Sequence, residues 1–171
     1  MYVGWPGSVH DARVLANSSV YEKIIDGKLL CGTAQNGIPL FLLGDSAYPL
    51  RPWLMKPFPH SGALSSQQKL YNYRICRGRV VVEIAFGQLK ARWRWLSKQN
   101  DMNVENVPAV VGACCTLHNI CQIHGDIFND EWLNEINDAD PSNPLDETST
   151  TQGSGVSTRQ ALVQYFSDNP L

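Results

Sequence analysis

The longest apolar run in the chain, residues 38–43, constrains the fold most strongly because its length suits a strand. Pro39 interrupts the run near its start, where a strand tolerates proline. Apolar side chains at successive positions predict a strand buried on both faces, as in the middle of a parallel or mixed sheet. Asp45 follows two residues after the run, so a carboxylate is expected at the carboxyl end of this strand. The sequence therefore predicts an α/β fold.

Helical patterns lie on both sides of this strand. Ser8 is expected to cap a helix in which Val14, Leu15 and Val20 face a core, with Asp11 three positions after the cap. Residues 49–62 contain four prolines and predict an irregular loop. A long helix is expected over roughly 66–97, and its second half carries an apolar stripe. The stripe consists of Val82, Phe86, Leu89, Trp93 and Leu96.

A second helix is predicted from Ala109 to about His124, because Pro108 suits the first turn of a helix. Its expected core stripe consists of Val110, Ala113, Leu117 and Ile120. Residues 1–125 are taken as the main domain, and residues 126–157 as an acidic, low-complexity linker. Residues 158–171 are expected to form a short helix and tail. That helix either docks onto the domain through Leu162, Val163 and Phe166 or stays loose.

Charge is strongly segregated along the chain, although the net charge is only −2. Residues 51–98 carry ten lysines and arginines against one acid, whereas residues 101–171 carry eleven acids against one base. A basic middle and an acidic tail favour a body that binds a polyanion such as nucleic acid, with a basic surface that has no partner as the alternative. No apolar run approaches the roughly 20 residues of a membrane span. Five cysteines, an odd number, favour a reducing compartment.

Asp45 and Glu83 are the most suggestive candidate pair. Glu83 lies beside the apolar stripe of the long helix, and Arg79, Lys90 and Arg94 fall on its face of that helix. Carboxylates suit Mg²⁺, and the bases suit phosphates, so this pattern is typical of phosphodiester chemistry. The alternatives are that Asp45 is a turn residue and that Glu83 forms a surface ion pair.

Cysteine and histidine residues gather within eleven residues of the chain. They are Cys114, Cys115, His118, Cys121 and His124. A zinc site is one interpretation, but a single helix cannot surround a metal, and the other is that the residues pack in a core with His118 hydrogen-bonded. Trp93 is expected in the core, whereas the placement of Trp95 is open.

Four motifs are specific enough to identify a family. The chain resembles the catalytic domain of Harbinger/PIF-type transposases and their domesticated nuclease-like descendants over roughly residues 3–125. The motifs, in the order of that family, are Gly-Trp-Pro-Gly-Ser-Val-His-Asp-Ala-Arg-Val from residue 4, Leu-Gly-Asp-Ser-Ala-Tyr-Pro-Leu from residue 43, the segments 72–74 and 77–93, and Cys-Thr-Leu-His-Asn-Ile-Cys from residue 115.

The resemblance implies a ribonuclease H-like fold with an Asp-Asp-Glu triad that binds divalent metal. Asp45 matches the second aspartate and Glu83 matches the glutamate of that triad. Two ions, normally Mg²⁺ with Mn²⁺ as a substitute, would support cleavage of DNA strands. Arg79, Lys90 and Arg94 are the candidates for DNA phosphate contacts. The resemblance also implies a Myb-like DNA-binding partner protein, and location in the nucleus with the cytoplasm as a second site.

The first aspartate of the family lies upstream of the motif that begins at residue 4. Residues 1–125 are therefore expected to be a partial nuclease domain that lacks the first strands of the sheet, and Asp11 does not match the first aspartate. An impaired metal-dependent endonuclease is the main hypothesis. A non-catalytic DNA- or protein-binding remnant is the alternative, and a purely structural chain is a third. We also expect marginal stability of the isolated chain, because an incomplete sheet leaves an unpaired edge.

Overall fold

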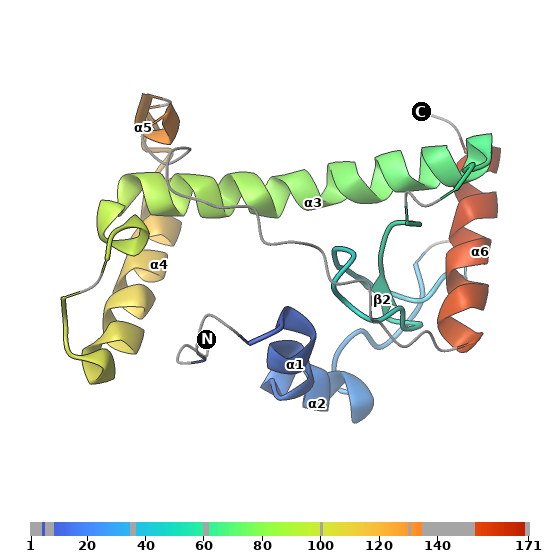
Figure 1. The fold of residues 1–171 in the computed structure, drawn as a ribbon, viewed down its shortest axis with the longest axis horizontal. Helices are drawn as coiled ribbons and strands as arrows, with labels where there is room; N and C mark the ends of the chain where they lie inside the picture. The colour runs from blue at the N-terminus through green and yellow to red at the C-terminus, as the bar shows by residue number, and fades with distance from the viewer. Residues whose placement is uncertain are drawn as a thin grey trace. The chain divides into compact units, whose positions relative to one another are not determined.

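The computed structural model describes Trp5 and residues 9–34, 37–59, 62–99, 101–129, 131–134 and 153–169. The chain divides into two compact units, one of residues 7–80 and 144–171 and the other of residues 1–6 and 81–143. The first is called the sheet unit below, and the second the helical unit. Figure 1 shows the elements. They are α1 (Asp11–Ala16), α2 (Ser19–Ile25), β1 (Leu42–Leu43), β2 (Leu54–Met55), α3 (Ser66–Arg92), η1 (Arg94–Ser97), η2 (Val104–Asn106), α4 (Val107–Ile123), α5 (Glu131–Asn134) and α6 (Gly153–Asp168).

The sheet of the described residues is a parallel pair, β1 and β2, in which Leu42 pairs with Leu54 and Leu43 with Met55. A parallel or mixed sheet was predicted, and the pair is parallel. The prediction of a strand over residues 38–43 that is buried on both faces was wrong. Leu40 and Leu43 are 42% and 37% exposed. The reason is that, among the described residues, β1 pairs with β2 alone. The predicted irregular loop over 49–62 was also wrong in part, because it contains the buried strand β2.

The core of the sheet unit joins segments that are far apart in the sequence. Its fully or nearly buried members are Leu50, Met55, Tyr71, Ile75, Leu162 and Val163. Two of the six come from α6, which lies beside β2 (Figure 1) and also contributes the partly buried Phe166. The helix expected from residue 158 begins at Gly153 and is docked rather than loose. Gly155 permits this approach, because a Cβ atom there would lie 3.1 Å from the backbone of Arg51.

The first helix begins later than predicted. α1 starts at Asp11, and His10 occupies the N-cap position without a side-chain capping bond, while Ser8 lies outside the described residues. Ser18 caps the next helix instead, since its hydroxyl accepts a hydrogen bond from the amide of Tyr21. The prediction that Val20 faces a core was wrong, because its side chain is exposed.

Both long helices form as predicted, but their expected apolar stripes are partly wrong. α3 ends at Arg92 rather than near 97, and a short 3-10 helix follows. Leu89 is buried as expected, whereas Val82 and Phe86 are 50% and 57% exposed. Apolar side chains occur all round this part of α3, so periodicity cannot select a single buried face. None of the helices that the structure describes has the length and apolar character needed to cross a membrane.

In α4 the buried side chains are Cys114 and His118, while Leu117 and Ile120 of the predicted stripe are exposed. The small thiol and the imidazole occupy the packed face, and the larger aliphatic residues face outward. Most of the expected acidic linker, residues 135–152, lies outside the described residues. A short helix, α5, forms at its start.

Candidate functional site

The turn after β1 holds Asp45 in a fixed conformation. Its Oδ1 atom accepts a hydrogen bond of 2.9 Å from the amide of Ala47, and its carbonyl accepts one from the amide of Tyr48. This bond from a side-chain oxygen to an amide two residues later is the turn geometry favoured by aspartate. The turn interpretation of Asp45 is therefore confirmed. It is compatible with a functional role, because the half-buried carboxylate stands at the carboxyl end of a parallel strand.

Gly44 allows this turn to fold back on itself. A Cβ atom at Gly44 would lie 3.1 Å from the Cβ and Cδ2 atoms of Tyr48 and 3.2 Å from Cδ1 of Leu54. The amide of Gly44 also donates a hydrogen bond of 2.9 Å to the carbonyl of Met55, which ties the turn to β2. The Tyr48 side chain consequently packs directly against the start of the turn that carries Asp45.

Tyr48 marks a small charged neighbourhood in the sheet unit. Burial first, and then the carboxylates of Asp11 and Asp45, raise its pKa to about 12, while the Arg79 guanidinium acts in the opposite direction. The phenol is therefore protonated at neutral pH. The structure thus brings Asp45 and Arg79 into one neighbourhood, together with Asp11. Sequence reasoning preferred a capping role for Asp11 and passed over Tyr48, although both lie in the quoted motifs.

Lys56 is a second residue that sequence reasoning did not assign. It follows β2 directly, and its Nζ atom donates a hydrogen bond of 3.1 Å to the carbonyl of Ser46. Its own carbonyl accepts a hydrogen bond from the hydroxyl of the buried Tyr71. The parallel register is the signal that was missing, since the carboxyl ends of paired parallel strands meet at one edge.

The other predicted site residues lie along α3 and η1. Arg79 is half-buried and belongs to the sheet unit, whereas Glu83, four residues further along α3, is exposed and belongs to the helical unit. Lys90 is exposed in the last turn of α3. The prediction that Arg94 continues the helical face of Glu83 was wrong, because α3 ends at Arg92 and Arg94 begins η1.

Within the described ranges, no three histidine, cysteine or acidic side chains come together as a metal-binding group. That finding includes the Cys/His cluster of α4. The core interpretation is confirmed for Cys114 and His118, which are buried, and is wrong for His124, which is exposed. The prediction that His118 is hydrogen-bonded is wrong for one of its two ring nitrogens, because the buried Nδ1 atom has no partner among the described residues. Trp93 is half-buried, and its indole N–H also has no partner there.

His118 makes the stability of the helical unit depend on pH. Burial, and then the positive charge of Arg92, lower its pKa below the ordinary value of 6.5. The unfolded chain therefore binds a proton more readily than the folded one. The contribution of the neutral His118 to stability is thus fully present above about pH 6.5 and is lost as the pH falls. We expect the melting temperature to fall between pH 7.5 and 5.5, and to fall less in His118→Gln. His124→Gln, at an exposed position, is the control. An equal pH dependence in His118→Gln and the wild type would contradict this assignment.

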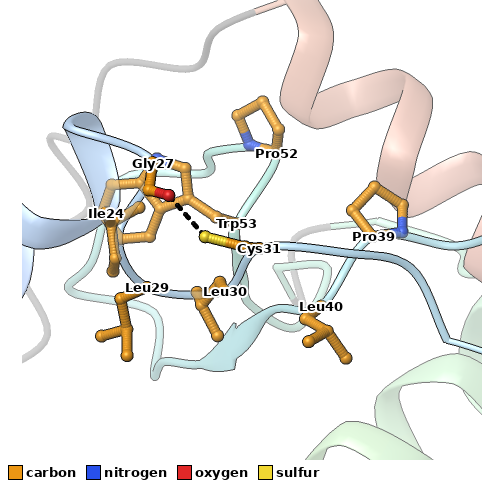
Figure 2. Close-up of a pocket in the computed structure, with 9 residues that line it drawn as sticks. All are labelled: Ile24, Gly27, Leu29, Leu30, Cys31, Pro39, Leu40, Pro52 and Trp53. Carbon is orange, nitrogen blue, oxygen red and sulfur yellow. Dashed lines mark hydrogen bonds between the residues drawn. The ribbon is translucent and has the colours of Figure 1, made fainter.

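The sheet unit also contains an apolar pocket of about 280 Å³. Figure 2 shows the lining, which includes Trp53 and Leu40 and a hydrogen bond from the Cys31 thiol to the carbonyl of Gly27. Leu30, also in the lining, has a positive φ of 58°. None of the described residues that line this pocket carries a carboxylate or belongs to the predicted site. It is therefore separate from the Asp45 turn.

Comparisons with known proteins match most of the chain. The family described as DDE superfamily endonuclease matches residues 1–119. "Protein ALP1-like" of Arabidopsis thaliana is 31% identical over 147 residues, covering 79% of this chain and 35% of the relative. "Putative nuclease HARBI1" of Mus musculus is 32% identical over 137 residues, covering 77% of this chain and 35% of the relative. The chain thus spans about a third of the length of these relatives. No solved structure matches.

Proposed function

The chain belongs to the DDE superfamily endonucleases, and from this premise we propose that it is a transposase-derived, divalent-metal-dependent DNA endonuclease module. The observation that carries the proposal is the Asp45 turn. A carboxylate is fixed at the carboxyl end of β1, and its charge acts on the Tyr48 phenol together with the opposing charge of Arg79. The family match covers this part of the chain. We propose a ribonuclease H-like architecture for the same reason, to which the small parallel sheet would belong.

Asp45 and Glu83 are the proposed metal ligands. Their chemistry fits a hard cation, since carboxylate oxygens are what Mg²⁺ and Mn²⁺ take from proteins. When bound, such ions activate a water molecule and stabilise the leaving oxygen of a phosphodiester. The role of the protein's own residues is to hold the two carboxylates in position. The Ala47 amide does so for Asp45, and the helical backbone of α3 carries Glu83.

The cationic side chains are proposed to hold DNA. Arg79 lies in the charged neighbourhood of Tyr48, and Lys90 and Arg94 are exposed near the end of α3. All three belong to residues 51–98, the segment with ten bases and one acid. Lysine and arginine contacts to phosphates would make binding weaken steeply with salt. A Myb-like partner protein and a nuclear location, with the cytoplasm as a second site, remain part of the proposal.

We expect slow cleavage by the 171-residue chain acting alone. The resemblance implies three carboxylates, and two of them are matched in these residues. Fewer ligands leave the metal more weakly held and less well positioned, and positioning supplies much of the rate in this kind of chemistry. The segregated charge favours a second candidate function, in which the chain binds DNA or protein without cleaving.

Nicking of supercoiled plasmid DNA tests the proposal. The wild-type chain is expected to nick in Mg²⁺ or Mn²⁺ and to stop on addition of a chelator. Glu83→Gln, which removes one charge and keeps the shape, is expected to abolish the activity. Glu131→Gln, at an exposed glutamate of α5, is the matched control and should nick at the wild-type rate. Equal nicking by Glu83→Gln and the wild type would contradict the assignment of Glu83 as a metal ligand. DNA binding without nicking would favour the second function.

A further inference from the structure

One face of α4 is exposed, largely apolar and free of charge. The 17 residues of this helix include no lysine, arginine, aspartate or glutamate. On the side away from the buried Cys114 and His118, exposed positions follow one another at steps of four, three, four and three residues. These positions, called the α4 seam below, are Ala109, Ala113, Thr116, Ile120 and Ile123. Such spacing aligns side chains in one line along a helix, which is the pattern by which one helix packs against another.

The helical unit buries few apolar side chains and leaves this face uncovered. Its buried apolar residues, among those that the structure describes, are Leu89, Ala91 and Cys114. The larger side chains of Ile120 and Ile123 are 46% and 81% exposed. A helix that faces water normally carries charged and polar residues on that side, so an uncharged aliphatic face indicates a surface that binds a partner.

The chemistry of the seam favours an apolar partner. Its one polar side chain, Thr116, donates a hydrogen bond of 2.9 Å from Oγ1 to the carbonyl of Gly112, one turn earlier in the helix. This hydroxyl is therefore satisfied within α4, and covering it with an apolar surface leaves no donor unpaired. A polyanion such as nucleic acid would find no cation on the seam, although cations supply most of the affinity for phosphates.

The sizes of the side chains along the seam fit a second copy of the same helix that runs in the opposite direction. Ala109 and Ala113 make the first half small, whereas Ile120 and Ile123 make the second half bulky, and Thr116 lies between the halves. In an antiparallel pair centred on Thr116, the isoleucines of each copy lie over the alanines of the other and fill the space there. Because the seam carries no charge, a two-fold axis brings no like charges together.

We propose that the α4 seam binds the α4 seam of a second copy of this chain as an antiparallel, two-fold symmetric pair. Ala109 then faces Ile123 of the second copy, and Ala113 faces Ile120 of the second copy. This inference goes beyond the proposed nuclease function and does not depend on it. The seam is only about 21 Å long at the helical rise per residue, so the interface is small and we expect a dimer that dissociates in the micromolar range.

Sedimentation velocity of the full chain over a series of concentrations tests the proposal. The wild type is expected to pass from monomer to dimer as its concentration rises. Ile120→Glu places a charge in the seam and should stay monomeric, and Ala113→Glu should do the same if the first variant fails to fold. Ile127→Glu is the matched control, because Ile127 lies outside the seam and is 94% exposed. A wild type that is monomeric at every concentration, or a dimer that persists in both seam variants, would overturn the proposal.

A size exchange tests the antiparallel direction. Ala113→Ile adds apolar surface, yet we expect it to weaken the dimer by about tenfold, because the new side chain meets Ile120 of the second copy. Adding Ile120→Ala to this variant exchanges the two sizes and should restore the wild-type affinity. Stronger dimerisation of Ala113→Ile alone would overturn the antiparallel pairing. None of these measurements uses DNA or metal, so their failure is distinct from failure of the proposed nuclease function.

Discussion

Replacing Tyr71 with alanine is expected to lower the free energy of unfolding by about 3–5 kcal/mol, the range for truncating a buried aromatic side chain. Tyr71 is fully buried in the sheet unit. Its ring centroid lies 5.3 Å from that of Phe58 and 6.1 Å from that of Phe166, so it links the loop after β2 to α6. Its hydroxyl also donates to the carbonyl of Lys56, which the variant leaves without this partner.

Urea unfolding followed by circular dichroism measures this loss. Tyr73→Ala is the matched control, because Tyr73 lies two residues further along the same helix and is 56% exposed. It should change the free energy of unfolding by less than about 0.5 kcal/mol, as surface substitutions usually do. Similar midpoints for the two variants would contradict the core described for the sheet unit.

Asp45→Asn is expected to separate folding from chemistry. An asparagine Oδ1 atom can accept the same hydrogen bond from Ala47, so the turn and the melting temperature should be retained. The charge that would hold a metal ion is lost. We therefore expect metal-dependent nicking to fall by about two orders of magnitude or more, as when one preorganised electrostatic group is removed from an active site.

The comparison with Asp45→Ala completes this experiment. Alanine also removes the acceptor for the Ala47 amide, so it should cost about 1 kcal/mol of stability in addition to the activity. Asp45→Asn with the wild-type nicking rate would show that the carboxylate serves the turn alone. If Asp45→Asn melted at a temperature as low as Asp45→Ala does, the charge rather than the hydrogen bond would be what supports the turn.

Features that depend on local chemistry were predictable from the sequence. The helical pattern predicted α3, which begins at Ser66, and Pro108 marked the first turn of α4. The turn at Asp45 followed from the residue type and its position after an apolar run. In each case the determining residues lie within a few positions of one another, where propensity and capping apply directly.

Features that depend on distant segments were not predictable in this way. The exposure of Leu43 follows from the single partner of β1 among the described residues, and no local pattern specifies how many strands pair. The face of α4 that is buried carries Cys114 and His118, at the same helical spacing as the more apolar stripe that was expected. Asp11, in the motif that begins at residue 4, acts electrostatically on Tyr48, in the motif that begins at residue 43. Only the folded chain brings these two motifs together.

Binding of Mn²⁺ to the purified chain, followed by electron paramagnetic resonance of the free ion, tests the central claim most directly. The account predicts saturable binding by the wild type, at least about tenfold weaker binding by Asp45→Asn and by Glu83→Gln, and competition by Mg²⁺. Asp26→Asn is the control, because Asp26 is an exposed partner of Lys28 on α2's carboxyl end. Equal Mn²⁺ affinity in the wild type and in both carboxylate variants would contradict the assignment of Asp45 and Glu83 as metal ligands.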